Sequence, residues 1–161
     1  MKFGSGAVRL QDIVNGRLFA GIVPWPRMAR EKVSAKNAGI VTVLAANTAI
    51  LTLALQDVLS NDLLLVSARV SGTKGITLGN TDIFVNFSAG TASFFAYNDK
   101  LLLDTRLNNQ PASSVCIQTL VGMLSIFGGG TLTLALTGAS AGSNLTVSAG
   151  DGQLEVLVLR F

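Results

Sequence analysis

The side chains that most often carry out catalysis are scarce in this chain of 161 residues, which contains no histidine and a single cysteine. A nucleophilic thiol or hydroxyl needs a neighbouring base, and most zinc sites use several histidines or cysteines. Cys116 lies in the apolar run Val115–Ile117, without a basic neighbour in sequence. We therefore expect Cys116 to be a small buried side chain, and we expect no enzyme activity, no cofactor and no metal site.

The carboxylates are spaced as in turns rather than as in a catalytic or calcium-binding group. No Asp-x-Asp-x-Asp-Gly run occurs, although Asp151–Gly152 lies at a predicted turn. The Gly128–Gly130 run lacks the Lys-Ser or Lys-Thr pair that completes a phosphate-binding loop. Aspartates commonly cap turns and strand ends. We assign that role to Asp57, Asp62, Asp82, Asp99 and Asp104.

The composition indicates that much of the surface contacts something other than water. Hydrophobic residues make up 49% of the chain and charged residues 13%, whereas a typical soluble domain has about 25% charged residues. The longest uncharged stretches, residues 37–56 and 107–150, are interrupted by polar residues and glycines, so we expect neither a membrane span nor a membrane as partner. Other protein subunits are the favoured cover.

Charge divides the chain into an N-terminal arm, residues 1–36, and a body, residues 37–161. The arm has seven basic and two acidic residues, a net charge of +5, and the body has five basic and seven acidic residues, a net charge of −2. The arm shows no strand alternation, and Pro24-Trp25-Pro26 holds it extended. A disordered tail is the alternative. The residues that we expect to anchor the arm are Arg9, Arg17, Trp25, Arg27 and Arg30.

The partner of the arm is predicted from the spacing of its charges. Its basic residues are spread over 36 positions without a dense run, and the body is acidic. This pattern favours docking on an acidic protein shell over contact with nucleic acid, for which Trp25 could otherwise stack a base. The first residues show no apolar signal sequence, so we expect synthesis in a cytosol.

From residue 38 onward the hydrophobic pattern has a period of two, which predicts short strands separated by Gly, Asn, Asp and Ser. Gly90-Thr91 predicts a hairpin, and Gly122 predicts a bend or bulge in the long apolar segment 115–127. We expect the C-terminal strand to lie in the interior of a sheet. The ten predicted strands are residues 40–44, 50–56, 63–70, 82–88, 93–97, 100–106, 115–127, 131–137, 144–148 and 153–161.

Three segments, Asp62–Thr73, Gly130–Gly138 and Ala141–Leu159, resemble the last strands of C1q/TNF-like jelly rolls, especially those of bacteriophage virion proteins. The resemblance covers roughly residues 40–161 and is one of pattern. It implies an all-β fold, a jelly-roll β-sandwich of about ten antiparallel strands, carrying the extended N-terminal arm. It also implies a homotrimer in which the inner sheets of three copies pack around an axis.

The leading hypothesis is a structural virion protein, a trimeric capsid decoration or cement protein that is made in the host cytoplasm and docks on the major capsid protein through its arm. The alternative is the receptor- or glycan-binding head of a phage tail or head fibre, with the site on the loops Thr73–Asn80 and Asn98–Lys100. Apolar residues near the chain's uncharged segment and its end would form the trimer interface. These candidates are Val115, Ile117, Leu120, Leu124, Phe127 and Phe161.

Overall fold

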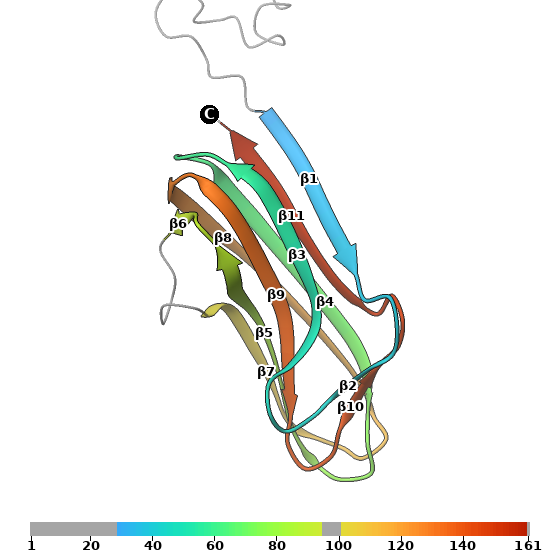
Figure 1. The fold of residues 1–161 in the computed structure, drawn as a ribbon. Helices are drawn as coiled ribbons and strands as arrows, with labels where there is room; N and C mark the ends of the chain where they lie inside the picture. The colour runs from blue at the N-terminus through green and yellow to red at the C-terminus, as the bar shows by residue number, and fades with distance from the viewer. Residues whose placement is uncertain (1–28, 95–100, 161) are drawn as a thin grey trace, which may run out of the picture.

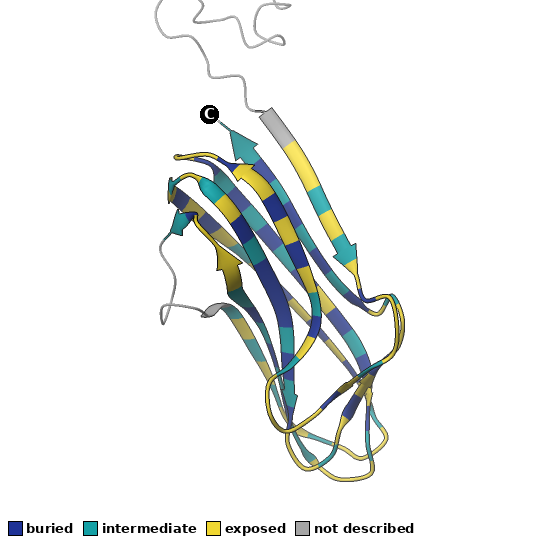
Figure 2. Cartoon of the chain, in the orientation of Figure 1, coloured by how far each residue is buried: buried dark blue, intermediate teal, exposed yellow. Residues whose placement is uncertain are grey.

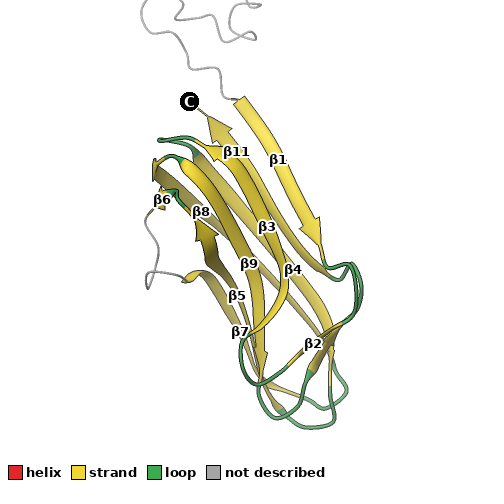
Figure 3. Cartoon of the chain, in the orientation of Figure 1, coloured by secondary structure: helices red, strands yellow, loops and turns green. Residues whose placement is uncertain are grey.

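The computed structural model describes residues 29–94 and 101–160, with the side chains of residues 31–94 and 103–160. Two antiparallel sheets pack face to face (Figure 1), and the described residues form strands and loops without a helix (Figure 3). This part of the chain therefore has no helix that could cross a membrane. The strands are β1 (Ala29–Lys36), β2 (Val41–Val43), β3 (Thr48–Val58), β4 (Leu63–Lys74), β5 (Gly79–Gly90), β6 (Ser93–Phe94), β7 (Leu101–Gln110), β8 (Val115–Gly128), β9 (Gly130–Ser140), β10 (Leu145–Val147) and β11 (Gly152–Arg160).

Seven strands form the larger sheet around the long strand β4. β11 and β10 pair in succession with one edge of β4, and β8 pairs with its other edge. β1 and β2 continue the sheet beyond β11 and β10, and the short β6 pairs with the end of β8. β11 therefore lies between β1 and β4, so the predicted interior position of the C-terminal strand is confirmed.

Four strands form the smaller sheet, in the order β3-β9-β5-β7. The pairing of β3 with β9 has two irregularities, after Ala49 and after Leu55, and that of β5 with β9 has one after Phe87. Neighbouring strands in both sheets come from distant parts of the sequence, as in a jelly roll. The predicted all-β jelly-roll sandwich is therefore confirmed, and each of the ten predicted strands corresponds to a strand of the structure.

Strict alternation of side chains builds the core between the two sheets. Successive side chains of a strand point to opposite faces of its sheet, and in β4 and β11 every second residue is buried (Figure 2). β9 lies at the centre of the smaller sheet and buries three consecutive residues, Leu134–Leu136. Side chains that are completely buried include Leu64, Ile83, Val85, Leu132, Leu134, Leu136, Leu145, Leu154 and Val156.

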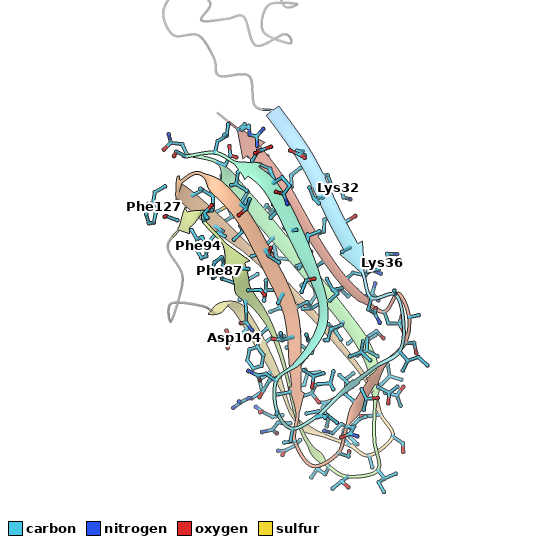
Figure 4. The ribbon with its side chains drawn as sticks, viewed as in Figure 1. Lys32, Lys36, Phe87, Phe94, Asp104 and Phe127 are labelled. Carbon is cyan, nitrogen blue, oxygen red and sulfur yellow. The ribbon has the colours of Figure 1, made fainter. Side chains whose placement is uncertain are left out.

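The chain crosses between the two sheets after β5. Phe87 of β5 and Phe94 of β6 meet edge to face, with ring centroids 5.3 Å apart and planes at 64° (Figure 4), a favourable geometry for an aromatic pair. β6 pairs with β8 of the larger sheet, where Phe94 lies opposite Ile126. The hairpin predicted from Gly90-Thr91 is therefore wrong, because the strand that follows pairs in the other sheet.

β1 corrects the predicted boundary between arm and body. Residues 29–36 pair with β11, from Ala29 opposite Arg160 to Lys36 opposite Gln153. Val33 and Ala35 pack against the core, whereas Lys32 and Lys36 are exposed. In the sequence this weak alternation is masked by the basic residues, so the pattern predicts an arm without strands. The sandwich thus includes residues 29–36, and the rest of the predicted arm, residues 1–28, lies outside the described residues.

Gly122 does not form the predicted bulge. β4 and β8 pair without a register shift from Leu63, opposite Ser125, to Thr73, opposite Val115. A Cβ atom at Gly122 would instead overlap the Leu103 side chain of β7. The glycine is required for a close approach, because it lets the edge of the smaller sheet close over the inner side of β8.

Candidate functional site

The groups with chemical reactivity are held in structural roles. Cys116 is buried, with 2% of its surface exposed, and its thiol donates to Oε1 of Gln110 at 3.4 Å. Within residues 31–94 and 103–160 no group of three or more histidine, cysteine or acidic side chains is placed to hold a metal ion. The described part of the chain therefore offers no metal-binding cluster of these side chains.

Two of the five aspartates form ion pairs rather than a catalytic pair. Asp62 is buried, accepts the Leu59 backbone N–H at 2.8 Å, and pairs with Arg160 at 3.3 Å. Asp82 pairs with Arg106 on the neighbouring strand β7, with Nη2 of the arginine 2.9 Å from Oδ2 of the aspartate. This hydrogen bond, helped by the charge of Asp82, raises the pKa of Arg106.

The five predicted turn aspartates divide between turns and strands. Asp57 has a left-handed backbone with φ of 54°, and its carbonyl accepts Nη2 of Arg160 at 2.8 Å. Asp104 is exposed but lies inside β7, as Asp82 lies inside β5, so the predicted turn role is wrong for these two. Asp99 lies outside the described residues.

A buried lysine is the polar feature that sequence reasoning missed. β4 continues beyond its predicted end at Val70 to Lys74, whose side chain is 1% exposed. Its ammonium donates to Ser140 Oγ at 2.7 Å, to the Ser143 carbonyl at 2.9 Å and to the Ala141 carbonyl. Burial lowers the pKa of Lys74, and the nearby Cys116 partly opposes that effect. The sequence Thr73-Lys74-Gly75 is typical of a turn, so it does not indicate that the lysine is buried.

The outer side of β8 is the principal candidate for a functional surface. Along this strand buried and exposed residues alternate, and the exposed positions are apolar for most of its length. Met123 is 71% exposed, Val115 66%, Val121 64%, Phe127 57% and Ile117 54%. Five large apolar side chains on one strand, all more than half exposed, are unusual for a surface in contact with water.

The neighbouring strands extend this apolar surface across the larger sheet. Leu65 of β4 lies opposite Met123 on one side and opposite Leu157 of β11 on the other. Leu63 lies opposite Leu159 in the next row, and all four leucines are only half-buried. Residues that lie directly opposite one another in a sheet share one face. We call this surface the apolar face; it consists of Leu63, Leu65, Val115, Ile117, Val121, Met123, Phe127, Leu157 and Leu159.

Charged and polar side chains interrupt and border the apolar face. Arg69 of β4 is exposed opposite Thr119, in the row between those of Val121 and Ile117, so it separates Val115 and Ile117 from the rest of the face. Lys32 of β1 (Figure 4) pairs with Glu155 of β11 at 2.8 Å, and their side chains are 60% and 45% exposed. The part of the face around Met123, Leu65 and Leu157 is thus an apolar centre with polar neighbours, an arrangement that protein interfaces commonly show.

Of the six predicted interface residues, three are exposed in the structure, two are buried and one lies outside the described residues. Val115, Ile117 and Phe127 lie on the apolar face, with more than half of each side chain exposed. Leu120 and Leu124 are 5% exposed and belong to the core of the sandwich, so they cannot contact another subunit directly and this part of the prediction is wrong. Phe161 lies outside the described residues. Sequence reasoning missed Val121 and Met123, which the alternation of β8 places on the same side of the strand as Ile117.

The predicted docking residues lie almost entirely outside the structure. Arg9, Arg17, Trp25 and Arg27 fall outside the described residues. Arg30 belongs to β1, where its backbone pairs with Leu159, and its side chain is not among those described. Near the start of β1 a groove of about 320 Å³ lies between β1, β3 and β11. It is lined by Glu31, Val33, Ala54, Leu55, Gln56, Asp57, Val58, Val158 and Arg160.

Comparisons with known proteins agree with the fold. No protein-family model matches the chain, and no curated protein matches it. Among solved structures, that of Eiger TNF from S. frugiperda matches with a TM-score of 0.51 and 10% sequence identity, over 84% of this chain and 94% of that chain. At this identity the likeness shows a TNF-like jelly-roll fold alone.

Proposed function

We propose that this chain is a non-enzymatic structural protein that assembles as a homotrimer through its apolar face and is carried on a larger particle by residues 1–28. The observation that carries the proposal is the row of large side chains on the outer side of β8, from Val115 to Phe127, each more than half exposed. Burial of apolar surface stabilises by roughly 25 cal/mol per Å². A second and a third copy, each with the same face, would supply that burial.

The apolar face suits permanent association better than a transient contact. Its centre, where Met123, Leu65 and Leu157 lie side by side across three strands, holds no charged residue. Interfaces of obligate oligomers resemble a core cut in half, whereas transient interfaces are more polar. The trimer itself follows from the resemblance to C1q/TNF-like jelly rolls, in which inner sheets pack around an axis.

The proposed particle is a virion, and the proposed role is capsid decoration. This part rests on the sequence: the resemblance extends to jelly rolls of bacteriophage virion proteins, and residues 1–28 carry four basic residues, Trp25 between two prolines, and one acidic residue, Asp12. Apolar burial of Trp25 and pairing of the arginines with an acidic capsid protein would supply affinity and orientation. The protein would then be made in the host cytoplasm and located on the virion.

A fibre head remains the second candidate, favoured by one observation. The loop between β4 and β5, within the predicted site Thr73–Asn80, is strongly exposed, with Ile76 at 88% and Leu78 at 57%. Its exposed side chains are aliphatic rather than aromatic, which does not favour glycan binding. The other predicted loop, Asn98–Lys100, lies outside the described residues.

The experiment that tests the proposal measures mass and attachment separately. Light scattering after size exclusion should give three times the chain mass of 16.7 kDa. Deletion of residues 1–28, which leaves β1 in place, should preserve this mass and abolish co-sedimentation with capsids assembled without the protein. A monomer at high concentration would overturn the trimer. Attachment that survives the deletion would overturn the role of the N-terminal segment.

A further inference from the structure

The end of the sandwich that lies farthest from the start of β1 is built from four loops (Figure 1). We call it the distal tip; it consists of Leu44–Asn47, Gly75–Leu78, Pro111–Ser114 and Ala141–Asn144. None of these sixteen residues is charged. Three large aliphatic side chains are exposed on it, Ile76 at 88%, Leu78 at 57% and Leu44 at 48%, and most of its surface is in solvent (Figure 2).

The loops of the distal tip are joined to one another by backbone hydrogen bonds. The Gly75 N–H donates to the Asn144 carbonyl at 2.8 Å, and the Gly75 carbonyl accepts the Ser113 N–H at 2.8 Å. The Leu44 carbonyl accepts the Ser140 N–H at 2.7 Å, at the end of β9. Loops from four separate parts of the chain thus form one connected surface.

Side chains inside the tip satisfy further polar groups of these loops. Ser143 Oγ donates to the Thr77 carbonyl at 2.9 Å and accepts the Thr77 N–H at 3.2 Å. The buried Lys74 ammonium donates to the carbonyls of Ala141 and Ser143. Removing a backbone polar group from water without a partner is costly, so these internal bonds lower the cost of placing the loops in a medium of low polarity.

We propose that the distal tip binds the surface of a neutral lipid bilayer, with Ile76 and Leu78 inserted at the level of the headgroups and the first acyl carbons. A bilayer offers no hydrogen bonds to a loop within its apolar region, and the Gly75 and Thr77 backbone groups on either side of Ile76 are paired within the tip. Only side chains enter, so no strand or helix has to span the bilayer. The proposal does not depend on the trimer, although three parallel copies would present three tips at the same end.

The composition of the tip argues against the other classes of partner. Nucleic acid and anionic lipid headgroups attract Lys and Arg, and protein hot spots are enriched in Trp, Tyr and Arg. The sixteen residues contain none of these side chains. Asn47, Thr77, Ser113 and Asn144 are exposed on the same loops, and their uncharged hydroxyl and amide groups suit the headgroup layer of a neutral bilayer.

The position of the tip relates it to the proposed role on a particle. The distal tip and the start of β1, to which residues 1–28 are attached, lie at opposite ends of the sandwich (Figure 1). A molecule anchored by that segment would therefore present the tip away from the particle. Contact with a membrane would follow attachment of the particle to a cell or to a vesicle.

Flotation of the full chain with phosphatidylcholine vesicles tests the proposal, with Ile76→Ser as the variant and Ile40→Ser as its matched control. Ile40 is 73% exposed but lies on the loop between β1 and β2, outside the distal tip. The wild-type chain and Ile40→Ser should float with the vesicles. Ile76→Ser should lower partitioning by about tenfold, since burial of one isoleucine side chain contributes that order of binding. Raising the salt concentration should have little effect.

Four results would overturn the proposal. The wild-type chain could stay below the vesicles, or Ile76→Ser could float as well as the wild type. Binding that requires phosphatidylserine and disappears in salt would indicate residues 1–28 instead. A fall in mass of Ile76→Ser without vesicles would make the tip a contact between copies. Light scattering without vesicles reports the trimer separately, so failure of the proposed function and of this proposal are distinguishable.

Discussion

The two outer faces of the sandwich differ sharply in what they expose. Of the ten large hydrophobic side chains exposed in the described residues, five lie on β8 of the larger sheet and none lies on the smaller sheet. The outer side of the smaller sheet carries Thr52, Ala54 and Thr137, with Phe84 half-buried among them and the Asp82–Arg106 ion pair beside it.

The difference shows that fold alone does not decide where a sandwich meets another protein. The strands of both sheets are paired through backbone hydrogen bonds, and both sheets cover the same core. On the smaller sheet, Asn86 Nδ2 donates to Thr137 Oγ1 at 2.9 Å, and hydroxyl and amide groups of this kind are well solvated. On the larger sheet the row Met123–Leu65–Leu157 across β8, β4 and β11 is apolar throughout, as a row in a core would be. Substitutions on the two sides of β8 test this contrast.

A single carboxylate in the centre of the apolar face should have the largest effect. Met123→Asp would place a charge among the same residues of neighbouring copies, and an unpaired charge at a buried contact is strongly unfavourable. We expect the trimer to dissociate to monomers. Thr52→Asp, an exposed position on the smaller sheet, should leave the mass unchanged. Light scattering at several protein concentrations measures the mass of both variants. If Met123→Asp stays trimeric, the apolar face is not the trimer interface.

The inner and outer sides of β8 should respond differently when one of their side chains is shortened to alanine. In the monomeric Met123→Asp background, Leu124→Ala should lower the free energy of unfolding by about 2–5 kcal/mol, because Leu124 is 5% exposed and its loss leaves a cavity. Val121→Ala on the outer side should change it by no more than roughly 0.5 kcal/mol. Urea denaturation measures both values. Equal losses would mean that β8 does not present two distinct sides in the isolated subunit.

The period of two in the sequence located the strands well, and the reason is visible in the core. β4 and β11 bury every second residue over nearly their whole lengths, and β5 does so from Thr81 to Val85, so the sequence pattern and the pleat coincide. The same pattern failed for residues 115–127. Apolar residues there occupy both sides of the strand, so the sequence could not indicate that Leu120 and Leu124 face the core while Val121 and Met123 face outward.

Other features depend on neighbours that a local pattern does not contain. β1 has only Val33 and Ala35 to indicate its buried side, and its place in the sheet is fixed by β11, more than a hundred residues later. β6 pairs with β8 rather than with β5, which no turn signal at Gly90 could reveal. Lys74 becomes buried because the loop 141–143 supplies its acceptors. Acceptors that far along the chain leave no mark on the residues around a lysine.

The smallest of the three effects should come from one methyl group on the inner side of β8. Gly122→Ala would push a Cβ atom into the Leu103 side chain, and Leu103 is half-buried, so it can move at moderate cost. We expect the free energy of unfolding to fall by about 1 kcal/mol. In a Leu103→Ala background the clash is absent, and Gly122→Ala should be neutral or slightly stabilising, because glycine is unfavourable within a strand.

A double-mutant cycle of Gly122→Ala and Leu103→Ala in urea therefore separates packing from backbone effects. If Gly122→Ala costs less unfolding free energy in the Leu103→Ala background than in the wild type, the reason for the glycine is the contact between β7 and β8. Additive losses would instead mean that Gly122 is needed for the strand's own conformation. The outer side offers the comparison: Val121, the preceding residue of the same strand, is 64% exposed. Its substitution should show no interaction with Leu103, because the two side chains lie on opposite sides of the sheet.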